Sequence, residues 1–599
     1  MKKIFSCIFY IILLIKMDLN ASAAIMQSKI NYTVTFPEAQ AHYTHIEMTI
    51  TGLTQGFVDV KMPVWTPGSY LVREFAKNVE GFVAEANGEK VAASKTSKNT
   101  WHIESGSASS VKISYDVYCF EVSVRTSLVD ASQGFLSTSG MFMYPDGMLH
   151  EPSTLHIIPY QGWKTVSTSL EAVGGDPFTL YSPDYDTLFD SPIQVGNQDV
   201  FDFDAAGVKY EVAMCGGGNY DKGRLKKDIT KIVEQETAIY NDNPNKRYVI
   251  IVHNYAKGGG GLEHLSSTVL GATRDGYTNE ATYHNFLVLV AHEHFHLWNV
   301  KRLRPFALGP FDYEKENYTT NLWIAEGFTT YYQSLIMRRA NLYALDDHLK
   351  IVADNLSGID NQPGSKIQPV SEGSFDAWIK FYRPNENSAN TTISYYNKGA
   401  AIAMLLDLEI IYASKATMCL DDVMKYMYDE YYKAKKRGYT DAEFKIALEK
   451  FTGKNLDDFY KKHINGVDVI DYDNYLNYAG YKLVNTLANR NDAFLGISLA
   501  PITGRNIIAS ISRNSPAWVA GVSANDELLA IDGASVSDLD KYLAKKKPGD
   551  QIELNLNRDG IEIKLSITLS KNEQVKYSIS DTGKASAEQL AVRKKWLNL

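Results

Sequence analysis

Short segments in which apolar and polar residues alternate dominate the first third of the chain. Tyr32–Phe36, Ile46–Ile50 and Val111–Tyr115 each show this alternation, and turn residues separate such segments. Strict alternation is typical of strands that bury one face. The pattern predicts a β-sandwich-like domain over residues 24–205. The aromatic turn Trp65–Tyr70 within it could face substrate, but a structural corner is the simpler interpretation.

The pattern changes to helical spacing near Lys222. Apolar residues within Leu225–Tyr240 lie on or near one side, which predicts an amphipathic helix, and Tyr248–Val252 follows as a short buried strand. Later apolar stretches predict further helices at Phe286–Trp298, Leu322–Tyr332, Ala400–Leu406, Leu420–Tyr432 and Thr440–Thr452. Residues 206–488 are therefore predicted to form a mainly helical domain.

A strand-rich pattern returns over residues 491–572. Phe494–Ile497 opens a strand, Ser515–Val522 predicts a short helix, and Asp526–Gly533 predicts a strand with a tight turn. The remaining residues, 573–599, form a tail in which Ala585–Leu599 is predicted as a helix that packs on the body. The sequence thus predicts a multidomain α+β protein.

Length and charge fit this organisation and exclude one function class. A chain of 599 residues corresponds to about four domain-sized units. The net charge is -9 and the pI is about 5.9, with no strongly basic stretch. These values argue against nucleic acid as a partner.

The N-terminus resembles an export signal. Lys2 and Lys3 precede the apolar stretch Ile4–Ile15, and Ala21–Ala23 offers small residues for cleavage. We therefore expect residues 1–23 to be a cleavable signal peptide and the product to be periplasmic or secreted. The stretch is too short to span a membrane comfortably, so no stable membrane anchor is expected.

Three cysteines follow the predicted signal peptide. They are widely scattered and have no metal-ligand spacing, so they form no disulfide framework. We expect buried, apolar thiols and leave one possible pairing open among Cys119, Cys215 and Cys419.

The most informative stretch is His292–His296, which has the pattern H-E-x-x-H. In a helix, His292 and His296 project from one face about one turn apart, where both imidazoles can bind one zinc ion. Glu293 between them can then reach a water on that ion. The pattern alone is weak, because a short motif arises by chance with a probability on the order of a few per cent.

Glu326 is the predicted third ligand. It is an acid among apolar neighbours in Leu322–Tyr332. A buried carboxylate is costly unless it is paired or bound to a metal, although a cap or a salt bridge would also explain it. Glu314 and Glu316 are rival ligands, but they lie in a polar stretch and need no explanation.

A glycine run follows the strand Tyr248–Val252 and ends in Glu263. No Lys-Ser/Thr follows it, which excludes a nucleotide-binding loop. Glycines also allow close approach to a peptide, so Gly260 and Gly261 are predicted to contact substrate with Glu263 at the edge of the cleft. Tyr395 or Tyr396 could donate to the oxyanion of the reaction, and the residues alone leave this choice open.

Longer motifs around these residues resemble the glycyl aminopeptidase family of zinc peptidases, which have an N-terminal β domain, a thermolysin-like catalytic domain and a C-terminal PDZ domain. The resemblance covers the whole mature chain. Its strongest motifs are H-E-H-F-H-L-W-N-V-K-R-L-R-P from His292, W-I-A-E-G-F-T from Trp323 and W-T-P-G-S-Y from Trp65. Phe494–Ile497 and Ser515–Ala517 resemble PDZ motifs.

The catalytic part also resembles, more distantly, the aminopeptidase N family. In that family, a Glu after a glycine-containing loop holds the substrate amine, which corresponds to Glu263, with His264 in place of Asn. A Tyr two residues before Lys-Gly supports the oxyanion, which selects Tyr396. The 29 residues between His296 and Glu326 exceed that family's spacing, so pocket details do not transfer.

The resemblance implies a Zn²⁺-dependent aminopeptidase that removes N-terminal residues, small ones such as Gly or Ala, from peptides. His292, His296 and Glu326 would hold the metal, and Glu293 would activate the water. The PDZ domain would bind peptide or protein C-termini. Two alternatives stay open, a zinc endopeptidase and a PDZ-containing, chaperone-like peptide-binding protein with vestigial catalysis.

Overall fold

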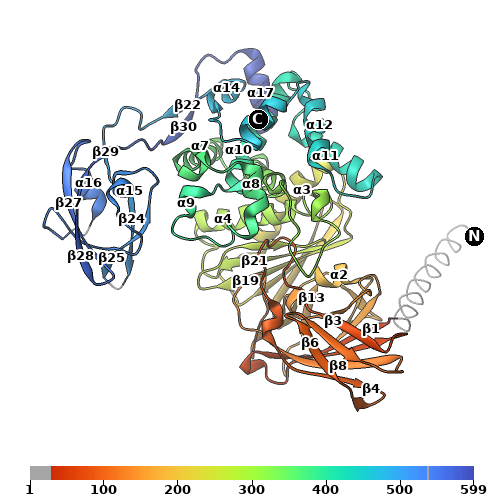
Figure 1. Ribbon diagram of the computed structural model, residues 1–599. Coiled ribbons are helices and arrows are strands. Elements are labelled where there is room, and N and C mark those ends of the chain that lie inside the picture. The colour runs from red at the N-terminus through yellow and green to blue at the C-terminus, as the bar shows by residue number, and fades with distance from the viewer. Residues whose placement is uncertain (1–27, 503, 536–537) are drawn as a thin grey trace, which may run out of the picture. The chain divides into compact units, whose positions relative to one another are not determined.

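The computed structural model describes residues 28–502, 504–535 and 538–599 (Figure 1). The chain divides into two compact units, residues 1–317 and 318–599. The predicted signal peptide, residues 1–23, lies outside the described residues. Within the described ranges, every helix is too short or too polar to cross a membrane.

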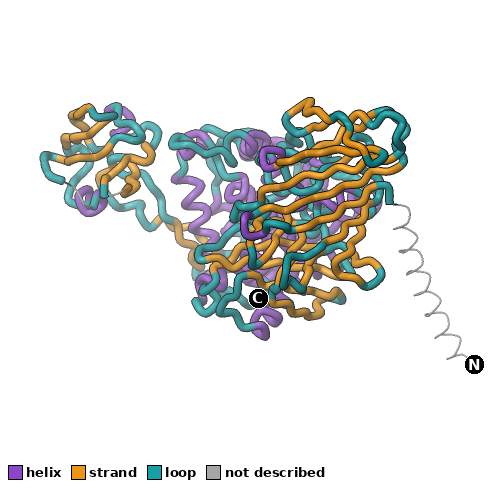
Figure 2. Tube along the Cα trace, turned by 90° about the horizontal axis from the view of Figure 1, so that it is seen from below, coloured by secondary structure: helices purple, strands orange, loops and turns teal. Residues whose placement is uncertain are grey.

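The N-terminal β-sheet domain is built on an eight-stranded sheet, whose long strands lie side by side in Figure 2. Its order is β14 (Glu171–Val173), β15 (Asp176–Ser182), β12 (Ser153–Ile157), β1 (Ile30–Thr35), β2 (Tyr43–Thr51), β8 (Ser110–Tyr118), β4 (Val79–Ala86) and β5 (Glu89–Lys90). The strands predicted from alternation correspond to β1, β2 and β8. Tyr32 pairs with Met48, and Met48 pairs with Ile113, so these buried residues share one face.

Two four-stranded sheets complete this domain. The first contains β13 (Thr165–Thr168), β16 (Ile193–Gly196), β10 (Gln133–Leu136) and β9 (Leu128–Asp130). The second contains β11 (Tyr144–Pro145), β3 (Phe57–Lys61), β7 (Thr100–Glu104) and β6 (Ala93–Ser97). Apolar residues from all three sheets share one hydrophobic core.

A five-stranded sheet follows in the same unit. Its order is β17 (Asp199–Ala205), β18 (Val208–Cys215), β19 (Arg247–Tyr255), β21 (Ser267–Thr273) and β20 (Gly261–Glu263). The hairpin β17–β18 crosses the boundary predicted at residues 205/206. Ala206 and Gly207 have φ of 49° and 78°, as a two-residue hairpin turn requires, so the two strands form one continuous hairpin.

Helices α3 (Lys222–Tyr240) and α4 (Glu280–Phe295) belong to this unit and contact each other. Short β20 lies at the edge of the sheet and pairs antiparallel with β21. Helix α4 packs on both strands, so the glycine run before Glu263 lies beside the helix that carries the H-E-x-x-H pattern.

The second unit begins with the predicted helical region. Its helices are α5 (Leu322–Ala325), α6 (Gly327–Arg339), α7 (Leu345–Asn361), α8 (Val370–Phe375), α9 (Ser388–Thr391), α10 (Tyr395–Ala413), α11 (Leu420–Met427), α12 (Asp441–Thr452), α13 (Asp457–Phe459) and α14 (Tyr472–Asn477). Helix α10 is buried over most of its length because its apolar residues surround it on all sides, and α5, α6, α7 and α12 pack against it.

The strand-rich module near the C-terminus has its own core. Its sheet order is β24 (Ile497–Ile502), β25 (Arg505–Ile511), β26 (Glu527–Ile531), β27 (Gln551–Arg558) and β28 (Ile561–Thr568), with short helices α15 (Pro516–Ala520) and α16 (Leu539–Leu543). The chain enters and leaves through the paired strands β22 (Tyr481–Asn485) and β30 (Tyr577–Asp581), and β23 (Ala493–Phe494) pairs with β29 (Ser570–Lys571) (Figure 1).

Residues predicted as a tail are therefore part of the fold. After β30, helix α17 (Ala587–Leu597) returns to the helical region. Trp596 is fully buried there, and its Nε1 donates to the hydroxyl of Tyr331 at 2.9 Å. The prediction that this helix packs on the body is confirmed. The three described cysteines, Cys119, Cys215 and Cys419, are free and buried, as expected.

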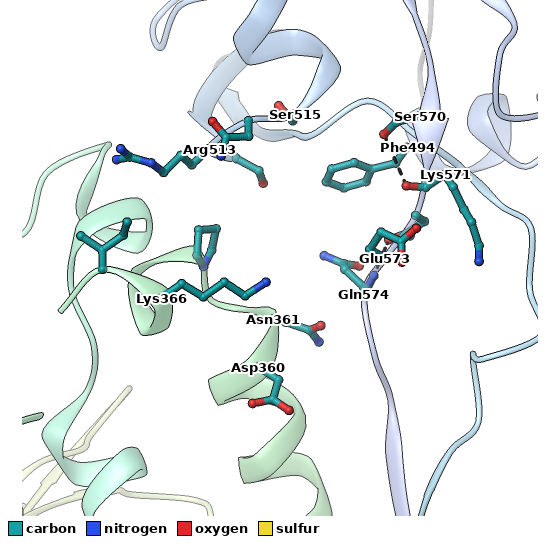
Figure 3. Close-up of a pocket in the computed structure, with 15 residues that line it drawn as sticks. Asp360, Asn361, Lys366, Phe494, Arg513, Ser515, Ser570, Lys571, Glu573 and Gln574 are labelled. Carbon is teal, nitrogen blue, oxygen red and sulfur yellow. Dashed lines mark hydrogen bonds between the residues drawn. The ribbon is translucent and has the colours of Figure 1, made fainter. Parts of the chain in front are cut away.

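Hydrogen bonds also attach the strand-rich module to the helices of its unit. The Asn390 side chain donates to the Ile511 carbonyl at 2.7 Å and accepts from the Arg513 amide at 2.8 Å. A cavity of about 360 Å³ lies beside this contact (Figure 3). Lys366, Arg513 and Lys571 line it together with Asp360 and Glu573, so its charges are mixed and favour no single class of ligand.

Candidate active site

Helix α4 carries the predicted H-E-x-x-H residues. The Asn279 side chain caps its N-terminus by accepting from the Thr282 amide at 3.0 Å. The helix ends at Phe295, and His296 is its C-terminal cap with helical dihedral angles. His292 and His296 therefore keep the one-turn spacing that the sequence predicted, although the helix is shorter than Phe286–Trp298 at its C-terminal end.

The two imidazoles face each other. Nε2 of His296 lies 3.1 Å from Nε2 of His292. His296 donates from Nδ1 to the Asn299 carbonyl at 2.7 Å, because a carbonyl can only accept. In the neutral ring, Nε2 of His296 then carries a lone pair that points toward His292. A backbone partner that fixes the tautomer in this way is typical of a metal-binding histidine.

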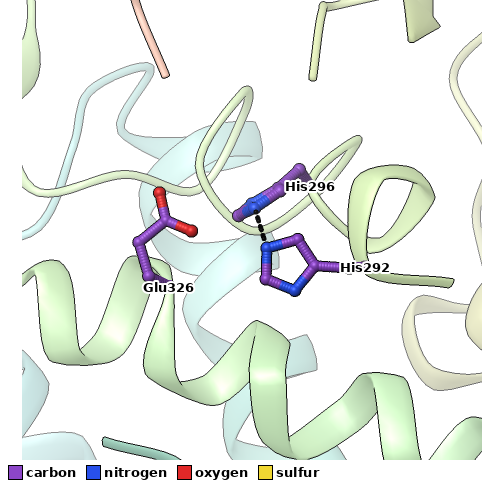
Figure 4. A group of neighbouring side chains, drawn as sticks. All are labelled: His292, His296 and Glu326. Atoms are coloured by element: carbon purple, nitrogen blue, oxygen red, sulfur yellow. Dashed lines mark hydrogen bonds between the residues drawn. The ribbon is translucent and has the colours of Figure 1, made fainter. Parts of the chain in front are cut away.

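Glu326 is the third member of this group. Ligand atoms of His292, His296 and Glu326 all lie within 4.8 Å of one another (Figure 4). Glu326 is 2% exposed, and a buried carboxylate is stabilised by a hydrogen-bond donor or a cation. Two imidazoles and one carboxylate form a typical catalytic zinc donor set, and the residues present therefore fit a divalent metal ion.

A close crossing of helices places Glu326. It sits at the break between α5 and α6, just before Gly327. A Cβ added to Gly327 would lie 2.5 Å from Cα of Gly399 in α10, and one added to Gly399 would lie 2.4 Å from the Trp323 carbonyl. Only glycine allows both backbones to approach so closely. This contact brings the N-terminal turn of α10, with Tyr396, next to Glu326.

The Tyr396 hydroxyl stays protonated and can donate a hydrogen bond. Burial, and then the charge of Glu326, raises the pKa of Tyr396 well above its ordinary value, so the phenol stays protonated at neutral pH. Its oxygen lies 3.3 Å from the Tyr382 hydroxyl. Tyr395, the alternative from sequence, is fully buried. The greater exposure of Tyr396 favours it as the residue that contacts substrate.

The Glu293 side chain packs against the glycine run Gly258–Gly261. A Cβ added to Gly261 would lie 2.3 Å from the Glu293 carboxylate. Arg125 donates to the Gly261 carbonyl at 2.8 Å and so holds this part of β20 from the N-terminal domain. Gly261 is therefore required because a side chain there would occupy the position of the proposed general base.

Glu263 belongs to the same cluster. Ligand atoms of Glu263, Glu293 and His296 lie within 4.8 Å of one another. Glu263 is 3% exposed, and among the described residues its Oε1 has no hydrogen-bond partner. Buried carboxylate oxygens are rarely left without partners, so this atom points to a ligand that donates hydrogen bonds.

The aromatic turn Trp65–Tyr70 closes the far side of Glu263. A Cβ added to Gly68 would lie 2.4 Å from Oε1 of Glu263, so the turn touches the carboxylate directly. This turn, Glu263 and Arg304 border a cavity of only about 20 Å³ that also includes Leu308 and Phe311. The structural-corner interpretation was thus incomplete, because the turn is also part of the site.

Asp190 of the N-terminal domain holds the segments on either side of this cavity. Its carboxylate accepts from Nδ1 of His264 at 2.9 Å, the Leu265 amide at 2.8 Å and Nζ of Lys301 at 2.8 Å. Burial alone would raise the pKa of Asp190, but the charge of Lys301 and the bond from His264 hold it below its usual value. Asp190 therefore remains ionised and fixes the residues next to Glu263.

His294, the middle histidine, lies on another face of α4. Its Nδ1 is 2.5 Å from Oε2 of Glu236, and its Nε2 is 2.9 Å from the Tyr210 hydroxyl. Burial lowers the pKa of His294 to about 3 and raises that of Glu236 well above its usual value. His294 therefore anchors the back of the helix and lies outside both candidate metal groups.

Gly68, Asp190 and Arg125 are parts of the site that the sequence did not predict. The motif at Trp65 was a signal for Gly68. Asp190 and Arg125 gave no local signal, because their partners lie 74 and 136 residues further along the chain.

Three regions of the chain match known protein families. Residues 31–197 match the Peptidase M61 N-terminal domain, residues 285–402 match M61 glycyl aminopeptidase, and residues 493–569 match the PDZ domain. A search of curated protein sequences found no match.

One solved structure shows the same architecture. An aminopeptidase N family protein from Idiomarina loihiensis is 29% identical, with a TM-score of 0.88 over 95% of this chain and 100% of that chain. An M1 zinc metallopeptidase from Deinococcus radiodurans is 12% identical, with a TM-score of 0.47 over 74% of this chain and 94% of that chain.

The fold and the His-His-Glu group define a metallopeptidase with a β-sheet domain, a helical catalytic region and a PDZ domain. Within that class, the chain belongs to the M61 glycyl aminopeptidase family.

Proposed function

We propose that this protein is a zinc-dependent aminopeptidase that removes small N-terminal residues from peptides. The observation that carries the proposal is the buried carboxylate of Glu263, whose Oε1 lacks a partner among the described residues and which clusters with Glu293 and His296. A substrate ammonium would supply the missing charge and hydrogen bonds. The turn at Gly68 closes the space beyond Glu263, which supports a chain end rather than a continuing chain at this point.

The metal would be held by His292, His296 and Glu326. Zinc bound there would polarise the scissile carbonyl and lower the pKa of a water, which is the chemistry that such donor sets support. The choice of zinc over other divalent ions rests on this donor set.

The other residues of the site have separate roles in the proposed reaction. Glu263 binds the ammonium and thereby places the first peptide bond over Gly261, beside Glu293. Glu293 takes a proton from the attacking water and delivers it to the departing amine. Tyr396 donates from its hydroxyl to the carbonyl oxygen as negative charge develops there.

The cavity beside Glu263 supports a small first residue. Its volume of about 20 Å³ is close to the minimum that holds one water molecule, which a methyl group could replace. Glycine and alanine therefore fit without rearrangement, whereas larger side chains require movement of Trp65 or Phe311.

A panel of aminoacyl chromogenic substrates tests the proposal. We expect release from free glycyl and alanyl substrates and little from leucyl or phenylalanyl ones, with loss of turnover after chelation and recovery with zinc. N-acetylation of the same substrates should abolish release. Cleavage of N-acetylated peptides at internal bonds at similar rates would instead establish the endopeptidase alternative.

For the PDZ domain, we propose binding of peptide C-termini along β24, the edge strand of its sheet. Gly496 supports this role, since its φ of +86° and its contact with Ser515, 2.1 Å from an added Cβ, shape the loop that would hold the carboxylate. Fluorescence anisotropy with free and C-terminally amidated peptides tests it, and equal binding of both would contradict it.

Export is a further part of the proposal. The N-terminal sequence supports cleavage near residue 23 and a periplasmic or secreted enzyme. Intact mass of the mature protein from cell fractions would test both points.

A further inference from the structure

We propose that the enzyme has a second specificity subsite, which takes an uncharged, apolar side chain from the residues that follow the scissile bond. This inference rests on the proposed function, because the position of the substrate amine at Glu263 sets the direction of the bound peptide. The subsite is a cavity of about 310 Å³ between the glycine run and helix α4.

The direction of the peptide leads to this cavity. The proposed amine position is at Glu263, and the proposed general base Glu293 lies against Gly261, two residues back along β20. A peptide that lies along the edge strand advances about 3.3 Å per residue. Continued in the same direction, it next reaches Gly260 and Gly259, which line the cavity.

Helix α4 leads to the same place. Leu289 also lines the cavity and precedes Glu293 by one helical turn, about 6 Å along the axis. Asn285 and Thr282 follow in the direction of the N-terminus of the helix. The cavity therefore begins next to the proposed reaction centre and extends away from it, on the side of the departing peptide.

The chemistry of the walls defines the ligand. Among the described residues that line the cavity, every side chain is uncharged. Its floor is aromatic, with Tyr277, Tyr283 and Phe286 each less than a tenth exposed. The Tyr277 hydroxyl donates to Asn254 and that of Tyr283 donates to Asp228, so both hydroxyls are already engaged and the rings offer apolar surface.

The volume of the cavity and the free-energy cost of burying a charge both favour an apolar side chain. A volume of about 310 Å³ is in the range of ligand pockets. Leucine, phenylalanine and similar residues fit such a space. A charged side chain would lose hydration without gaining an ion partner from the walls.

The glycines keep this space open for different reasons. A Cβ added to Gly258 would lie 2.0 Å from the Ala272 carbonyl, so that glycine is required for packing. A Cβ added to Gly259 would meet no atom within 4 Å, and Gly259 has no left-handed φ. A larger residue at Gly259 can therefore occupy space at the cavity without straining the backbone.

Two peptide series test the inference, Gly-X-Ala-Ala and Gly-Ala-X-Ala, with Ala, Leu, Phe, Glu or Lys at X. Glycine release by the full-length, zinc-loaded enzyme is measured by mass spectrometry. We expect kcat/KM for Leu or Phe to exceed that for Glu by about 10-fold or more at one of the two positions, as apolar pockets commonly discriminate. Equal rates for all five residues in both series would overturn the inference.

Matched variants connect the preference to the cavity. Gly259→Leu should remove most of the preference for Leu and Phe. Gly358→Leu is the control, because Gly358 is exposed in α7 and an added Cβ there also meets no atom within 4 Å. If the preference were unchanged in Gly259→Leu, its structural cause would lie outside this cavity, which would contradict the inference.

A charge at the exposed rim gives a second, less disruptive test. Asn285→Asp changes neither size nor burial and should raise kcat/KM for Lys at the sensitive position while lowering it for Glu. No change for either peptide would count against the subsite. If no peptide of either series releases glycine, the proposed aminopeptidase activity itself fails, and the inference fails with it.

Discussion

The two ends of β20 differ in almost every respect that matters for recognition. At Glu263, a cavity of about 20 Å³ is bordered by Lys301 and Arg304 and closed by Gly68. At Gly258–Gly260, a cavity of about 310 Å³ has uncharged walls. One short strand thus separates a small cavity with charged residues at its border from a large one with uncharged walls. Under the proposed function, this difference would make the enzyme strict about the first residue and its free amine but tolerant of bulk after the scissile bond.

The largest effect is expected at Glu293, which lies between the two ends. Glu293→Gln should lower kcat about 1,000-fold or more for every peptide, because the Gln amide cannot take up and deliver the proton. Metal content, measured by mass spectrometry, should stay that of the wild type, since Glu293 is not one of the three predicted ligands. Wild-type turnover in this variant would refute the proposed chemistry.

The next largest effect is expected at Glu263, and it should concern the small cavity and not the large one. Glu263→Gln should reduce kcat/KM about 100-fold on glycyl substrates with free amines, because the ammonium loses its charged partner. The preference for Leu over Glu after the scissile bond should persist on the remaining activity. If the variant lost that preference instead, the two cavities would not act independently.

A smaller effect is expected at Gly68, where the N-terminal domain closes the cavity of about 20 Å³ beside Glu263. Gly68→Ala should lower kcat/KM about 10-fold, because the added methyl displaces the Glu263 carboxylate. Gly88→Ala is the matched control, since Gly88 has a φ of +82°, close to the +86° of Gly68, but an open environment. Equal losses in the two variants would assign the effect to backbone strain and not to Glu263.

The smallest effect on activity should come from Asp190→Asn, which keeps the size of the side chain. We expect KM for glycyl substrates to rise a few-fold with kcat nearly unchanged, because Glu263 is less firmly placed. The free energy of unfolding should fall by about 3 kcal/mol at pH 7, as Lys301 loses a buried partner.

The pH dependence of that loss gives an additional check. The pKa of Asp190 is lower in the folded protein than in the unfolded chain, so its stabilisation is present above the ordinary carboxyl pKa of about 3.9. It is lost as pH falls through the folded-state pKa. Denaturant titrations should therefore show wild type and variant converging below about pH 4, and a constant gap at all pH values would contradict this assignment.

Local sequence patterns predicted one half of the site better than the other. His292, Glu293 and His296 follow from helical spacing, and Glu326 stood out as an acid in an apolar segment. Both depend on interactions within a few residues. Gly68 and Asp190 act across long separations of sequence, so no spacing rule connects either to Glu263.

The hydrogen bond from Trp596 to Tyr331 has a consequence for biosynthesis. These residues are 265 positions apart, and Tyr331 lies in α6, the helix that begins directly after Glu326. At about 5–20 residues per second, a ribosome needs on the order of tens of seconds to cover this distance. During that interval the strand-rich module can fold, while α6 still lacks its last packing partner. Helix α6, which begins directly after Glu326, thus gains this packing contact only after residue 596 has been synthesised.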